Sequence, residues 1–162
     1  MENKKPLVNG GYPLHTFQQV EDIYMLYISS EIDRRRIQDA YDFIMLKHKD
    51  QFRKSGEPYY HHLIEVAYIL ASLQCGPDTI ISGLLHDVVE DTDVTIEEIK
   101  KRWGEEVSKI VDALTKIQRL KLSRITSEEF EAEDHRKIFL GMAKDIRVIL
   151  IKLADRLHNL RT

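Results

Sequence analysis

Features that mark several other protein classes are scarce in this 162-residue sequence. Cys75 is the only cysteine, which excludes an internal disulfide and fits a reducing compartment. No apolar run approaches the roughly 20 residues that a membrane-spanning helix needs, and no signal-peptide core follows the N-terminus. The net charge is only −3, so the chain has no overall basic field for nucleic acid or an anionic membrane. We therefore expect a cytoplasmic domain that binds neither nucleic acid nor membrane directly.

Apolar residues do recur at helical spacing along most of the chain, without an alternating strand pattern. The length suits one domain with its own core, and 43% hydrophobic residues are typical of a globular protein. We predict a single all-α domain over residues 1–162, with a loose leader at 1–13 and a bundle of about eight helices. The predicted helices cover 17–29, 32–52, 62–74, 78–90, 95–103, 105–120, 127–143 and 145–160.

The most informative segment is GLLHDVVED, residues 83–91, in which ionisable side chains interrupt an apolar pattern. Burying His86, Asp87, Glu90 and Asp91 without compensation would be costly, and a bound cation supplies such compensation. On one continuous helix Glu90 follows His86, and Asp91 follows Asp87, by about one turn, so each pair shares a face. The alternative is a helix end whose histidine and acids face water, and this segment alone does not decide between the two.

Two other segments offer further metal ligands. His61 and His62 begin a predicted apolar helix, and Asp155 lies on the last predicted helix, whose wide apolar stripe indicates a position deep in the core. Alone, either segment has a structural explanation, such as a satisfied core histidine or an Asp–Arg pair. Together with His86 and Asp87 they give two imidazoles and two carboxylates on three helices. Such a set suits Mn²⁺, Fe²⁺, Zn²⁺ or another first-row ion.

Longer blocks around these residues resemble a known family. The order His … His-Asp … Asp is that of HD-superfamily phosphohydrolases, and the chain from about Ile37 onward resembles the N-terminal hydrolase domain of RelA/SpoT-type alarmone enzymes. The blocks are RKSGEPY (53–59), GLLHDVVEDT (83–92), DHRK (134–137) and KDIRVILIKLADRLHNLRT (144–162). The resemblance implies an HD-type helical bundle. It also implies metal-dependent hydrolysis of guanosine 3′,5′-bispyrophosphate (ppGpp or pppGpp) to GDP or GTP and pyrophosphate.

The resemblance also implies which residues hold the metal. The divalent cation is expected to be Mn²⁺. His62 occupies the family's ligand position in preference to His61, although Leu63 stands where the family usually has proline. The implied metal ligands are His62, His86, Asp87 and Asp155.

Further roles follow from the same resemblance. Glu90 and Asp91 match the acidic pair that orients and activates the attacking water. Arg53 matches a residue that packs on the guanine. The other implied substrate-binding residues are Lys54, Ser55, Asn159 and Thr162. Independently of the resemblance, the sequence offers a basic group that either binds phosphate or is simply solvated: Lys116, Arg119, Lys121 and Arg124.

Two alternatives stay open. An HD phosphohydrolase for another nucleotide would use the same metal ligands, but the loop at 53–59 and the Asn159/Thr162 ending argue against it. A regulatory fragment with little activity of its own is the second alternative. In the family this domain is followed by an alarmone synthetase domain, and the chain stops at Thr162 inside a motif that normally continues. We therefore expect a C-terminal truncation of a longer, multidomain protein.

Overall fold

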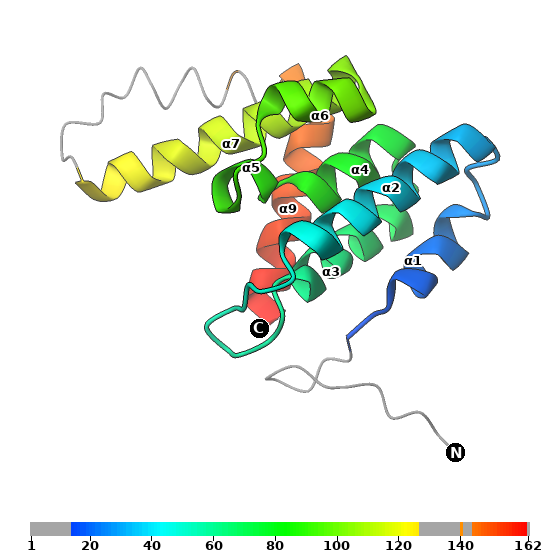
Figure 1. Ribbon diagram of the computed structural model, residues 1–162, viewed down its shortest axis with the longest axis horizontal. Helices are drawn as coiled ribbons and strands as arrows, with labels where there is room; N and C mark the ends of the chain where they lie inside the picture. Colours follow the sequence, from blue (N-terminus) through cyan, green and yellow to red (C-terminus); the bar gives the residue numbers. More distant parts are fainter. Residues whose placement is uncertain (1–13, 127–139, 141–143, 162) are drawn as a thin grey trace.

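The computed structural model of the chain describes residues 14–126, 140 and 144–161, which form a bundle of helices (Figure 1). In these residues the only β pairing is one isolated bridge between Phe52 and Pro58. None of the described helices is long and apolar enough to cross a membrane. The all-α prediction is confirmed, whereas the leader at 1–13 and nearly all of the predicted helix at 127–143 lie outside the described residues. The helices are α1 (Phe17–Tyr24), α2 (Glu31–Lys47), α3 (Tyr60–Ser72), α4 (Pro77–Leu85), α5 (Val88–Asp91), α6 (Ile96–Trp103), α7 (Glu105–Thr126) and α9 (Ile146–Arg161).

Helix α4 lies at the centre of the bundle. It packs against α2, α3, α7 and α9, and its side chains from Thr79 to Leu85 are buried. Gly83 allows α3 to approach closely, because a Cβ at this position would lie 2.5 Å from Leu70 Cδ1. The close contact between α3 and α4 brings the start of α3 beside the end of α4, where the ligand candidates lie.

Several predicted helix ends are wrong. Helix α1 ends at Tyr24 and not at residue 29, because residues 25–27 form a turn, and α4 ends at Leu85 and not at residue 90. Helix α2 ends at Lys47 and not at Phe52, because His48 has φ −105° and ψ 10° and the chain then enters a loop closed by the bridge to Pro58. Helix α7 continues to Thr126, beyond the predicted end at residue 120. Thr95 is the N-cap of α6, since its side chain accepts a hydrogen bond from the backbone N–H of Glu98 at 3.2 Å.

Helix α9 is less deeply buried than its sequence predicts. It packs against α3, α4 and α7, but Leu153 and Leu160 are 61% and 78% exposed. An apolar stripe wide enough for two sides of a helix is therefore covered on one side by the described residues. The buried positions of α9 are Val148, Ile151, Ala154 and His158.

Candidate metal centre

His86 and Asp87 lie in a turn between α4 and α5, and not within one continuous helix as predicted. The side chain of His86 explains the break. Its Nδ1 lies 2.6 Å from the carbonyl oxygen of Gly83, the acceptor that a continuing α-helix would offer to the backbone N–H of Asp87. The chain then resumes for a single helical turn that carries Glu90 and Asp91. The acidic pair thus follows His86 and Asp87 on a separate short helix.

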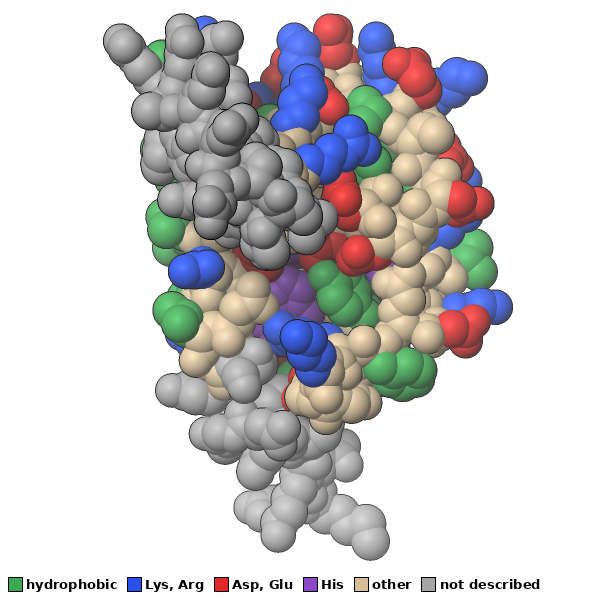
Figure 2. Space-filling model, turned by 90° about the vertical axis from the view of Figure 1, so that its left-hand side faces the viewer, with side chains coloured by type: hydrophobic (Ala, Val, Ile, Leu, Met, Phe, Trp, Pro, Cys, Tyr) green, Lys and Arg blue, Asp and Glu red, His purple; other side chains and the backbone are tan. Residues whose placement is uncertain are grey.

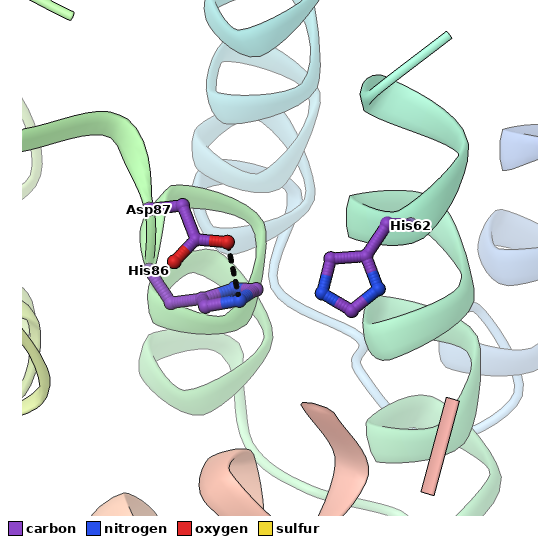
Figure 3. A group of neighbouring side chains, drawn as sticks. All are labelled: His62, His86 and Asp87. Atoms are coloured by element: carbon purple, nitrogen blue, oxygen red, sulfur yellow. Dashed lines mark ion pairs between the residues drawn. The ribbon is translucent and has the colours of Figure 1, made fainter. Parts of the chain in front are cut away.

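The fold brings the four predicted ligands together. Figure 3 shows His62 of α3 facing His86 and Asp87 across a narrow gap, and one ligand atom from each lies within 4.8 Å of the others. Asp155 of α9 completes the group, with its Oδ1 2.8 Å from His62 Nε2 and 3.5 Å from His86 Nε2. Two imidazoles and two carboxylates from separate elements therefore converge at one buried point.

Hydrogen bonds direct the Nε2 atoms of both histidines toward this point. Because His86 donates through Nδ1, its Nε2 is directed toward the carboxylates, 3.0 Å from Asp87 Oδ2. His62 Nδ1 lies 2.6 Å from Nδ1 of His158, which is buried on α9. Burial, together with the nearby His62 and Arg53, lowers the pKa of His158 to about 3. A neutral His158 accepts the Nδ1–H of His62, which leaves His62 Nε2 available as a ligand.

The charges of the cluster are strongly coupled. Burial disfavours a charge on His86, but the carboxylates of Asp87 and Asp155 outweigh this effect and raise the pKa of His86 well above its usual value. Burial also opposes ionisation of Asp87, yet His86 and the hydroxyl of Tyr59 lower the pKa of Asp87 to about 2. The carboxylates thus attract a positive charge, and a cation that binds them displaces the proton from the imidazole.

These residues fit a divalent cation. The donor set combines two imidazoles with two carboxylates, and the buried Nε2 of His86 faces the carboxylates of Asp87 and Asp155 at 3.0 and 3.5 Å. A cavity of about 10 Å³ adjoins His86, Asp87 and Asp155, close to the size of one water molecule. Mixed imidazole and carboxylate ligation suits several first-row ions and selects none of them.

The predicted acidic pair lies beside the cluster. Burial and the charge of Asp87 raise the pKa of Asp91 to about 6. Glu90 accepts a hydrogen bond from Arg119 Nε of α7 at 3.1 Å, so its carboxylate is fixed toward that helix. One acid is therefore easily protonated and the other is held by a cation from the protein.

The loop after α2 brings Arg53 to α9. It turns at Gly56, whose φ of +90° favours glycine, and Gly56 N donates to the carbonyl of Arg53 at 2.9 Å. The guanidinium of Arg53 donates to Asn159 Oδ1 at 2.6 Å and lies 3.4 Å from His158 Nδ1. Two predicted substrate-binding residues, Arg53 and Asn159, therefore meet next to the predicted metal ligands.

The other residues predicted to contact the substrate lie at the surface or outside the described side chains. On the face shown in Figure 2, histidine side chains reach the surface in the centre, bordered by acidic and basic side chains. Lys54 and Ser55 are exposed in the loop. Lys116 pairs with Asp112 of its own helix at 2.9 Å, as expected for a solvated face. Outside the described side chains lie Lys121, Arg124, Thr162 and the block at 134–137.

Sequence reasoning missed some residues around the cluster. Tyr59 was given no role, yet its hydroxyl donates to the carboxylate of Asp87. His158 was likewise not singled out, yet its ring contacts His62. A usable signal existed, because Tyr59 stands three residues before His62 and His158 three residues after Asp155. Residues at this spacing on a helix lie on the same side.

Comparison with known proteins identifies the family. The sequence profile of the HD domain matches residues 40–162, more than half of the chain. The chain belongs to the HD-domain family. This HD-domain chain is 43% identical over 146 residues, 90% of its length, to a guanosine-3′,5′-bis(diphosphate) 3′-pyrophosphohydrolase of Spiroplasma citri. It is 49% identical over 142 residues, 88% of its length, to a protein of the same name from Aquifex aeolicus.

Other relatives carry a different name. The HD-domain chain is 49% identical over 127 residues, 78% of its length, to a GTP pyrophosphokinase of Myxococcus xanthus. These three matches cover 19%, 20% and 17% of the relatives, so the chain spans about a fifth of their length.

A solved structure agrees with these matches. It is described as a metazoan orthologue of SpoT that hydrolyses ppGpp. The two structures align with a TM-score of 0.59 at 31% identity, over 78% of this chain and 68% of the other. The resemblance to the hydrolase domain of RelA/SpoT-type enzymes is confirmed.

Proposed function

We propose that this HD-domain chain hydrolyses ppGpp and pppGpp at the 3′-pyrophosphate, releasing pyrophosphate and GDP or GTP. The carrying observation is the convergence of His62, His86, Asp87 and Asp155 at one buried point, with both Nε2 atoms directed inward. The substrate is suggested by the relatives named as 3′-pyrophosphohydrolases and by the SpoT orthologue that hydrolyses ppGpp.

The four ligands would hold a divalent cation, for which we propose Mn²⁺. When bound, such a cation lowers the pKa of water and offsets negative charge on phosphoryl oxygens. The chain's own acids handle the proton. Asp91, with a pKa of about 6, is suited to accept a proton from water near neutral pH. Glu90, held by Arg119, is suited to orient that water.

The nucleoside end of the substrate belongs on the Arg53 side. The planar guanidinium of Arg53 can lie flat on a guanine ring. The same guanidinium contacts Asn159. We propose that Lys54 and Ser55 line the entrance to this nucleoside site and that Thr162 also contributes to nucleoside binding. The guanine would then lie beside α9 while the 3′-pyrophosphate reaches the metal ligands.

The larger context is part of the proposal. Because some relatives are named GTP pyrophosphokinase and are about five times as long, we propose that the whole protein also carries a synthetase domain. We also propose that it acts in the cytoplasm, because a single cysteine fits a reducing compartment.

The test uses the 162-residue chain, freed of metal and then supplied with Mn²⁺. Released pyrophosphate and phosphate are measured with ppGpp, pppGpp and a panel of other nucleotides. We expect Mn²⁺-dependent pyrophosphate release from the two alarmones alone. Asp87→Asn should abolish it, whereas Asp112→Asn, a control at the paired surface acid of α7, should not. Equal turnover by the Asp87→Asn variant would overturn the assignment, and preference for another nucleotide would overturn the substrate.

A further inference from the structure

A further buried histidine, His48, lies outside the ligand cluster and has no role in the proposed reaction. It follows the last residue of α2 and is fully buried. Its Nδ1 lies 2.8 Å from Oε1 of Gln51, and its Nε2 has no hydrogen-bond partner among the described residues. A buried polar ring with one partner calls for an explanation, because desolvating it is costly.

The partners of Gln51 fix the orientation of its side-chain amide. Gln51 Nε2 lies 2.8 Å from the backbone carbonyl oxygen of Asp91, and only the NH₂ group can donate to a carbonyl. The amide oxygen therefore faces His48 and must accept, so the proton of His48 is on Nδ1. Burial lowers the pKa of His48, which keeps the ring neutral and uncharged in this role.

Gln51 connects this pair to two other parts of the site. Its backbone carbonyl accepts a hydrogen bond from the N–H of Tyr59 at 2.9 Å, and the hydroxyl of Tyr59 donates to Asp87. Its side chain reaches α5 at the carbonyl of Asp91. Carbonyls at a helix C-terminus lack partners within the helix, and α5 has only four residues. Gln51 therefore supplies an anchor that α5 cannot provide by itself.

We propose that His48 and Gln51 are positioning residues that hold α5, and with it Glu90 and Asp91, in register with the metal ligands. This inference rests on the proposed function, since it assigns the acids a task in hydrolysis. His48 acts through Gln51: it holds the amide oxygen, so that the NH₂ group points at Asp91. Gln51 also stands two residues before Arg53 in the chain. The contact between Gln51 and Asp91 therefore positions the loop that carries Arg53 together with the acidic pair.

Matched variants separate positioning from simple packing. Gln51→Glu keeps the shape and the acceptor for His48 but removes the donor to the Asp91 carbonyl. His48→Leu removes the donor to Gln51. His48→Asn restores a side-chain NH₂ close to the place of Nδ1. Each variant is compared with the parent chain for kcat, KM, Mn²⁺ affinity by titration calorimetry, and thermal midpoint.

We expect His48→Leu and Gln51→Glu each to lower kcat about 10- to 100-fold, as for other residues that orient a site from outside it. Mn²⁺ affinity should change less than about threefold, because the four ligands stay in place, and His48→Asn should recover most of kcat. The double variant should be no worse than the poorer single variant. Unchanged kcat in Gln51→Glu, or a loss of kcat that merely follows Mn²⁺ affinity or thermal midpoint, would overturn the proposal.

A second measurement does not depend on turnover. In the parent chain, ¹⁵N NMR should show His48 neutral with its proton on Nδ1 and a protected carboxamide NH₂ at Gln51. A proton on Nε2 of His48, or a freely exchanging Gln51 amide, would refute the proposal that His48 and Gln51 hold α5 in place. A parent chain that shows both NMR signals but hydrolyses no alarmone would instead refute the proposed function.

Discussion

His61 and His62 follow one another on α3, yet they face different groups. His62 is 2% exposed and its Nε2 lies 2.8 Å from Asp155. His61 is half-buried and lies among acids away from the cluster: burial lowers its pKa, and Glu57 and Glu65 oppose that shift. Successive residues on a helix are rotated by about 100°. Residue type therefore offers two equal candidates, and only the phase of the helix selects the one that meets His86.

The difference between His61 and His62 is tested most directly by replacing each histidine in turn. His62→Ala should lower hydrolysis by about 10⁴-fold or more, because it removes a ligand from the group that holds the cation. His61→Ala should stay within about threefold of the parent chain, as for most changes outside a site. Turnover and Mn²⁺ affinity check both variants. A larger loss in His61→Ala than in His62→Ala would mean that the ligand has been misassigned.

Replacing an acid of the Glu90/Asp91 pair should lower activity less than replacing a proposed metal ligand. Asp91→Asn removes the group suited to accept a proton and should lower kcat about 10²- to 10³-fold. Unlike His62→Ala, it should leave Mn²⁺ bound, so calorimetry and turnover report different outcomes. Glu97→Gln, at an acid in the first turn of α6, provides the surface control. Joint loss of Mn²⁺ binding and turnover in Asp91→Asn would count against its separate role.

The contact between His158 and His62 should matter less again. His158→Leu removes the acceptor for His62 Nδ1–H and should weaken Mn²⁺ affinity about 10- to 100-fold. His158→Asn can place an amide oxygen near the lost Nδ1 and should recover part of that affinity. Equal affinities for the Leu and Asn variants would show that His158 serves packing alone.

The smallest expected effect concerns the fit between α3 and α4. Gly83→Ala places a Cβ 2.5 Å from Leu70 Cδ1, and such overpacking typically costs about 1–3 kcal/mol. Urea denaturation should show the lower free energy of unfolding. Combining the change with Leu70→Val should cost less than the two single changes added together, because the smaller side chain makes room. Strict additivity would contradict the close approach.

The sequence allowed the fold class and the meeting of four ligands to be predicted, because both follow from helical periodicity and from long blocks shared with a family. The break at His86 could not be predicted, since it depends on one bond between a side chain and the Gly83 carbonyl. The shallow position of α9 was missed for a related reason. An apolar stripe tells how much of a helix can be covered, but not which side its neighbours cover.

The single turn of α5 has a consequence for how activity is lost. The proposed cation ligands His62 and Asp155 stand on helices of 13 and 16 residues, whereas Glu90 and Asp91 stand on one of four. Short segments with few enclosing contacts open at lower free energy than the rest of a protein. Amide hydrogens of α5 should therefore exchange well before those of α4. Mild urea should therefore abolish hydrolysis while the cation is still bound.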